Sequence, residues 1–188
     1  MTDKQMLQEI LLQSPAIHQL LDDLKRVPLP GLYLGAGCIA QTVWNHLHGF
    51  SYDHGIDDAD IVYFDDVDLS EQGEEAALRA VQDALSHPVY RLDVKNEARV
   101  HLWYERKFGY AIAPYTSCEH AIDSWPTTAT AIGIRPIAGG MQVYAPYGLE
   151  DLMGGIVRAN KAQITEEIYQ KKTEKWRAKW PRLTILPW

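Results

Sequence analysis

The stretch DDADIVYFD at residues 57–65, preceded by the glycine turn LGAGC at residues 34–38, decides the fold of this chain. The apolar run IVYF is typical of a buried strand, and in a strand alternate side chains point to the same face. Asp58 and Asp60 then lie side by side, about 7 Å apart. Two carboxylates this close repel each other, and a divalent cation is the usual reason for a protein to keep them. Oxygen ligands favour Mg²⁺ or Mn²⁺, with phosphate oxygens completing the coordination.

Basic residues are absent around this motif. No Lys or Arg occurs between residues 27 and 78, whereas ten Asp and Glu fall in that span. The acidic residues between 65 and 75 are typical of a solvated turn and of the first turn of a helix capped by Ser70. Asp58 and Asp60 differ because they are joined to the start of a buried strand. The metal interpretation therefore rests on this pair.

Length and composition set broad limits on the class of protein. With 188 residues, 46% of them hydrophobic, the chain is long enough for one domain, or one domain plus an appendage. The net charge of −7 argues against a general nucleic-acid coat, although residues 158–188 carry +5 and the remainder −12. Two cysteines, the lack of a signal-peptide pattern and the lack of a long apolar run predict a soluble cytoplasmic protein without a membrane span.

The spacing of apolar residues, glycines and prolines predicts an α+β protein. Helices are expected over residues 3–26, with a restart at Pro15, and over 38–47, 71–86, 118–123, 149–157 and 163–180. Strands are expected over 32–34, 61–64, 89–94 and 100–104, followed by an additional β-hairpin of 131–137 and 141–145. Helices and strands alternate only through Pro88, which favours a mixed sheet of about five strands over repeated βαβ units.

Three segments are expected along the chain. Residues 1–30 form an N-terminal helical segment, residues 31–157 the main domain, and residues 158–188 a basic helix and tail packed on the same domain. Tryptophans among the basic residues of the tail are more typical of a packed helix with its charges in water than of a nucleic-acid contact. The expected core contains Leu34, Val43, Ile61, Val62, Phe64, Leu92 and Leu102.

The glycine turn also fits a different class of fold. Gly35-Ala36-Gly37, with Ala40 in the third small position, matches the loose turn of Rossmann-type enzymes that bind a nucleotide or S-adenosylmethionine. Asp65, after the apolar run, would then be the acidic residue at the end of the second strand. The acid pair before the strand and the early end of the βαβ alternation count against this alternative.

Several ordered blocks of the sequence resemble a known family. The order of strand, glycine turn, helix, acid-x-acid strand and further acid is similar to that of the polymerase β-like nucleotidyltransferase fold. The resemblance is closer to a family of small bacterial nucleotidyltransferase-like proteins of unassigned substrate, and it covers nearly the whole chain after residue 30. The blocks are VW at 43–44, DADIVYFD at 58–65, KNEARVHLWY at 95–104, TATAIG at 128–133 and APYGLEDL at 145–152.

This resemblance implies nucleotidyl transfer from a nucleoside triphosphate with Mg²⁺ or Mn²⁺. Asp58 and Asp60 would hold one ion, and a third carboxylate on a neighbouring strand would share a second ion. Asp93 is the expected third carboxylate, with Glu97 as the alternative if the strand continues that far. Phosphates are expected at the glycine turn and helix start, so Gly35, Gly37 and Cys38 are expected nucleotide-binding residues. Thr127 and Thr128 are further candidates for nucleotide contacts.

Three functions stay open at this point. The first is a metal-dependent nucleotidyltransferase acting on a small molecule, an RNA end or a protein. The second is the Rossmann-type enzyme, and the third is a catalytically silent binding module with the nucleotidyltransferase fold. Contact of Asp58 and Asp60 with a metal separates the first two. The presence of a third carboxylate separates the first from the third.

Overall fold

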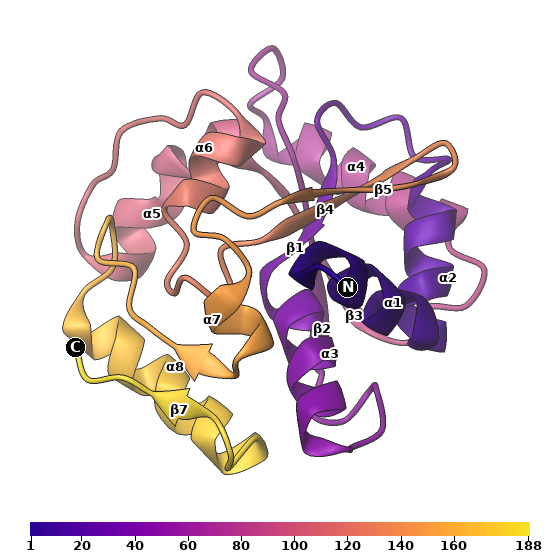
Figure 1. The fold of residues 1–188 in the computed structure, drawn as a ribbon. Helices are drawn as coiled ribbons and strands as arrows, with labels where there is room; N and C mark the ends of the chain where they lie inside the picture. Colours follow the sequence, from indigo (N-terminus) through magenta and orange to yellow (C-terminus); the bar gives the residue numbers. More distant parts are fainter.

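A five-stranded mixed sheet lies at the centre of the computed structural model, which describes all 188 residues (Figure 1). The strands in sheet order are β3 (Arg91–Asn96), β2 (Asp58–Tyr63), β1 (Tyr33–Gly35), β4 (Gly133–Ile137) and β5 (Gly140–Tyr144). β2 and β3 run parallel, and every other neighbouring pair runs antiparallel. This order confirms the predicted α+β sheet and excludes the doubly wound parallel sheet of a Rossmann-type fold.

The predicted hairpin forms, but it is part of the main sheet and not an addition to it. Gly139 has φ +77°, which gives the left-handed turn between β4 and β5. Leu34 of β1 pairs with Ile134 of β4, so the hairpin extends the sheet on the side away from β2. Sequence periodicity identifies a hairpin but does not show which strand it pairs with.

Helices cover both faces of the sheet. On one face lie α1 (Asp3–Gln13), α2 (Pro15–Leu24), α3 (Ala36–His48) and α4 (Glu71–Ala84), which share a large core with Leu34 and Ile61. On the other face, α6 (Cys118–Asp123) packs against Tyr33 and Val62, and α5 (His101–Phe108) lies beside it (Figure 1). The alternation of side chains along β1 and β2 thus separates two cores. No helix in the chain combines the length and apolar character that crossing a membrane requires.

The C-terminal residues are part of the large core. After α7 (Glu150–Met153), strand β6 (Ile156–Val157) pairs in parallel with β7 (Thr184–Ile185), and α8 (Glu166–Lys179) lies between them in sequence. Trp180 is fully buried, and its indole N–H donates a 2.6 Å hydrogen bond to Asn45 of α3. The ring of Trp44 contacts those of Trp176 and Trp180 edge-on, with centroids 5.3 and 5.4 Å apart. These contacts hold the C-terminal residues against α3.

The region after β3 differs from the sequence prediction. Residues 100–104 are helical and not a strand, because Asn96 ends β3 and caps the 3₁₀ helix η1 (Glu97–Arg99) through a 3.1 Å hydrogen bond from the Ala98 N–H. Leu102 was expected in the core but is 57% exposed on α5. Among the other expected core residues, Leu34, Val43, Ile61 and Val62 are buried, whereas Phe64 and Leu92 are half-buried.

Candidate active site

The two carboxylates singled out in the sequence lie on β2 and share one face of the sheet with a third. Asp60 is directly opposite Asp93 in the parallel register of β2 and β3, and Asp58 is opposite Arg91. Residues directly opposite in a parallel pair point to the same face, and residues two apart along a strand do so as well. Asp58, Asp60 and Asp93 therefore all point to the face that carries α5 and α6.

Two of these carboxylates are held by basic neighbours. Arg91 forms an ion pair with Asp58 at 2.8 Å, and Lys95 forms one with Asp93 at 3.2 Å. No three His, Cys, Asp or Glu side chains are arranged to hold one metal ion between them. The two-metal arrangement expected from the sequence therefore stays a prediction.

Asp60 is the most strongly perturbed of the three acids. Burial raises its pKa to about 7, and the neighbouring charges of Asp58 and Asp93 act in the same direction. A hydrogen bond from the backbone N–H of Gly37 works against this rise, because it favours the ionised form. The folded chain thus holds the carboxylates of Asp58, Asp60 and Asp93 close together next to the start of α3.

The glycine turn lies beside this acid. A Cβ on Gly37 would lie 3.9 Å from the Asp60 carboxylate, and a Cβ on Gly35 would lie 2.5 Å from the ring of Trp125. Between them, Ala36 has φ +48° and begins α3. Gly35 is therefore needed for packing, whereas Gly37 brings the backbone close to the carboxylate.

Of the other expected nucleotide-binding residues, none presents a free side chain to the site. Cys38 is fully buried, burial raises the pKa of its thiol, and its Sγ donates to the Gly35 carbonyl at 3.5 Å. Thr127 is buried and shares a 2.7 Å hydrogen bond with Thr130, and Thr128 donates to Asp151 at 2.6 Å. The buried Cys38 thiol lies beside the backbone of Asp60, and Thr127 and Thr128 are engaged with Thr130 and Asp151.

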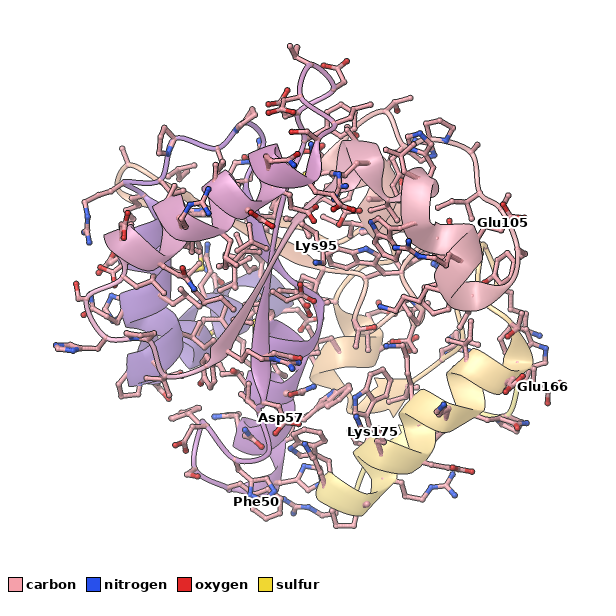
Figure 2. All side chains as sticks on the ribbon, turned by 180° about the vertical axis from the view of Figure 1, so that it is seen from behind. Phe50, Asp57, Lys95, Glu105, Glu166 and Lys175 are labelled. Atoms are coloured by element: carbon pink, nitrogen blue, oxygen red, sulfur yellow. The ribbon has the colours of Figure 1, made fainter.

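A cavity of about 260 Å³ opens in front of the acid pair. Its walls include Gly37, Asp58 and Asp60 on one side and residues of α8 on the other. Figure 2 shows this arrangement from behind, with Asp57 at the start of β2 and Lys175 on α8. We call this space the carboxylate cavity.

Sequence analysis missed the lysines of the carboxylate cavity. Lys172, Lys175 and Lys179 are spaced i, i+3, i+7, so they lie along one side of α8 and line the cavity together. Burial lowers the pKa of Lys172, and the charge of Asp60 partly opposes this effect. Lys179 pairs with Asp57 at 2.8 Å, whereas Lys172 and Lys175 have no acidic partner within 4.0 Å. The signal was available, because the lysines alternate with Trp176 and Trp180, whose large apolar rings indicate an inward side.

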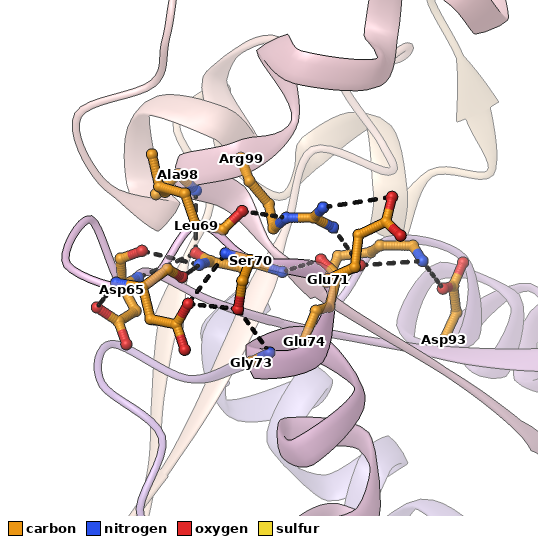
Figure 3. A network of polar contacts seen from close by, with 12 residues as sticks. Asp65, Leu69, Ser70, Glu71, Gly73, Glu74, Asp93, Ala98 and Arg99 are labelled. Atoms are coloured by element: carbon orange, nitrogen blue, oxygen red, sulfur yellow. Dashed lines mark hydrogen bonds and ion pairs between the residues drawn. The ribbon is translucent and has the colours of Figure 1, made fainter.

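Glu97, the alternative third carboxylate, is buried near the same acids. It is 5% exposed, and burial, followed by the charge of Asp60, raises its pKa to about 8. A polar network behind it fixes the end of β3 (Figure 3). In this network Glu74 of α4 accepts from Arg99 and from the Asn96 N–H at 2.9 Å each, and Lys95 bridges toward Asp93. The network thus fixes the two candidate acids, Asp93 on β3 and Glu97 at the start of η1.

The chain is similar to known proteins over most of its length. A family model described as nucleotidyltransferase matches residues 22–185. A solved NMR structure, described as revealing a CCA-adding enzyme head domain, is similar with a TM-score of 0.79 and 27% identity, covering 98% of this chain and 96% of that one. A search of curated proteins finds no match.

Proposed function

The chain belongs to the nucleotidyltransferase family, and we propose that it transfers a nucleotidyl group from a nucleoside triphosphate to an acceptor hydroxyl with a divalent metal ion. One observation carries the proposal. Asp58 and Asp60 share one face of β2, next to the backbone of Gly37, in a cavity whose opposite wall carries free lysines. Carboxylates that repel each other and lysines without partners fit a cation and a polyphosphate together.

The residues present fit a magnesium or manganese ion. Asp58 and Asp60 supply only oxygen donors, and a cation between them would offset the repulsion from Asp58 and Asp93 that, after burial, raises the pKa of Asp60 to about 7. The Arg91 side chain that pairs with Asp58 is 77% exposed, and such exposed pairs stabilise a protein by about 0–1 kcal/mol, so Arg91 can give way to an ion. When bound, the ion would neutralise the triphosphate and assist departure of pyrophosphate.

The chain's own residues position the nucleotide in this proposal. The start of α3 presents the positive end of a helix to phosphate oxygens, while the Ala36 N–H donates to the Ile132 carbonyl at 3.0 Å and the Gly37 N–H to Asp60. Lys172 and Lys175 face the same cavity and balance the remaining phosphate charge. Asp93, directly opposite Asp60 in register, is the proposed third carboxylate and would share a second ion near the acceptor hydroxyl. Glu97 is the alternative.

A catalytically silent binding module is the second candidate. It is favoured by the ion pairs of Arg91 with Asp58 and of Lys95 with Asp93, which already satisfy two of the three carboxylates. The two candidates differ in whether a nucleotide binds together with a metal.

Thermal unfolding tests the proposal. We expect Mg²⁺ or Mn²⁺ alone to raise the melting temperature weakly, and metal with one of the four triphosphates to raise it further, because phosphates complete the coordination of the ion. Asp58→Asn with Asp60→Asn should abolish this joint shift. The control is Asp66→Asn with Asp83→Asn, which removes two exposed charges of the same sign. A wild-type protein without any metal-dependent nucleotide shift would favour the binding module.

A further inference from the structure

A second hollow adjoins the carboxylate cavity. It has a volume of about 530 Å³ and lies between the end of α5 and α8. Its wall contains Lys107, Lys171, Lys172 and Lys175, together with Phe108 and a single nearby acid, Glu167. Lys172 and Lys175 line both spaces, so the two lie next to each other at these lysines. We call this second space the lysine groove.

The lysines of the groove have no acidic partners in the folded chain. None of the four forms an ion pair within 4.0 Å, although the protein has 25 acidic residues and a net charge of −7. Lys107 contacts only the aromatic rings of Trp103 and Phe108, with its Nζ 5.3 Å from each centroid. Four like charges gathered without a direct ion pair repel one another, so an external anion would stabilise them.

The shape and position of the groove favour an extended anion over a compact one. A nucleoside triphosphate carries all of its phosphates in one group, and the proposed function places that group in the carboxylate cavity. Lys107 and Lys171 line the groove and not the carboxylate cavity, so a triphosphate in that cavity leaves their charges without an anion. Lys107 also borders a separate hollow that contains Glu71, Glu74 and Glu75. Lys171 and Lys175 are separated by about 6 Å along the helix axis, which suits successive charges on a chain.

We propose that the lysine groove binds a single-stranded nucleic acid, whose terminal hydroxyl is the acceptor presented to the carboxylate cavity. This inference rests on the proposed function for the transfer step and on the groove for binding. The phosphodiester chain supplies the repeated anions, and the ring of Phe108 in the groove wall supplies a surface on which a base stacks. Because Lys172 and Lys175 border both the groove and the cavity, a strand in the groove would bring its end to the side of the cavity that faces the acids.

Fluorescence anisotropy with a labelled single strand tests the groove without metal or nucleotide. The probe is an RNA of about twelve nucleotides, with a DNA of the same sequence as a second probe. We expect binding that weakens with salt, and a loss of at least about tenfold in Lys107→Gln with Lys171→Gln. The slope of log affinity against log salt should fall by about 1.4 in this variant, because each single-strand phosphate contact contributes about 0.7.

The matched control removes the same charge elsewhere. Lys4→Gln with Lys161→Gln should bind the strand like the wild type, since neither lysine lines the groove. An equal loss in this control, or no binding by the wild type, would overturn the groove assignment. A polyglutamate peptide of equal charge that competes as well as the RNA would overturn the choice of nucleic acid.

The outcome is separable from that of the proposed function. If the metal-dependent nucleotide shift is present and strand binding is absent, only the groove assignment fails. If strand binding is present and the nucleotide shift is absent, transfer fails and the groove assignment holds.

Discussion

Asp60 brings the requirements of folding and of chemistry into conflict at a single side chain. Its carboxylate is held beside two other acids, and burial raises its pKa to about 7. A group whose ionised form is disfavoured in the folded state costs stability wherever it is ionised. Such a residue is retained for what it binds and not for what it adds to the fold.

Asp60→Asn should therefore stabilise the metal-free protein. The unfolded Asp60 ionises near pH 3.8 and the folded one near 7, so the penalty is absent at about pH 4, grows through that window and is complete above it. We expect a gain of about 1–3 kcal/mol at pH 8 and almost none at pH 4, measured by urea unfolding with a chelator. Asp66→Asn, at an exposed position, serves as the control. A loss of stability at pH 8 would contradict the assigned electrostatics.

We expect the same substitution to have different effects at the two glycines of the turn. In Gly35→Ala the new Cβ would lie 2.5 Å from the rigid ring of Trp125, so we expect destabilisation of about 1–3 kcal/mol. In Gly37→Ala the nearest atom is the flexible end of Gln41 at 3.1 Å, so folding should be almost unchanged. Chemical unfolding of both variants measures the difference, and equal stabilities would contradict the packing at Gly35.

Among the elements, α2 and α4 are joined by one buried carboxylate. Asp23 of α2 is 1% exposed and accepts hydrogen bonds from Arg26 at 2.7 Å and from the Ser86 N–H at 2.9 Å. Burial alone would raise its pKa, but the hydrogen bonds from Ser86, Arg26 and Gln19 outweigh burial and lower it. The carboxylate thus fixes the end of α4 against α2, on the face of the sheet away from the site.

Asp23→Ala should destabilise the protein by about 1.5–3 kcal/mol, because the charged hydrogen bonds to Arg26 and Ser86 are lost. The lowered pKa means that this contribution is present above pH 3.8 and lost as the pH falls through the folded-state value. The neighbouring Asp22→Ala removes only exposed pairs with Lys25 and His18, and we expect a much smaller change. Denaturant titrations at neutral and acidic pH compare the two. Similar losses would show that Asp23 has no special role.

At the level of the whole chain, the most acidic and the most basic regions face each other across one cavity. Residues 158–188 carry +5, and their helix α8 lies opposite the acid pair of β2. Three contacts hold it there, between Trp180 and Asn45, Trp176 and Trp44, and Lys179 and Asp57. The basic segment is therefore part of the core and of the site.

A chain ended after residue 157 should lose cooperative folding. Its remaining core would lack the buried side chains of Tyr169, Trp180 and Leu183, which pack with the rest of the large cluster. Loss of one buried Trp alone costs about 3–5 kcal/mol, a large share of the stability of a domain of this size. Circular dichroism melts test this expectation, and a cooperative transition in the shortened chain would contradict it.

Local patterns in the sequence were sufficient for the parts of the fold that depend on neighbours in the chain. The alternation in DADIVY placed Asp58 and Asp60 on one face, and the glycine turn, the Ser70 cap and the hairpin all depend on a few adjacent residues. The helix after β3 was missed because VHLWY has the composition of a strand, whereas the cap from Asn96 decides its conformation. The tryptophans indicated a packed helix, but the cavity that the lysines line was missed because it depends on long-range contacts such as that of Trp180 with Asn45, 135 residues away.

Asn96, in the network of Figure 3, has a consequence for how the chain reaches this structure. Its fully buried side-chain amide accepts a hydrogen bond from the Asp65 N–H at 3.0 Å and donates one to the Asp65 carbonyl at 2.8 Å. Parallel strands meet late and over a long separation in sequence, and a slip by one residue turns every side chain to the opposite face. The observed alignment of β3 satisfies the Asn96 amide, so a pairing of β2 and β3 shifted by one residue would leave buried polar groups unpaired and be less stable. The register that brings Asp93 opposite Asp60 is thus stabilised by a residue outside the site.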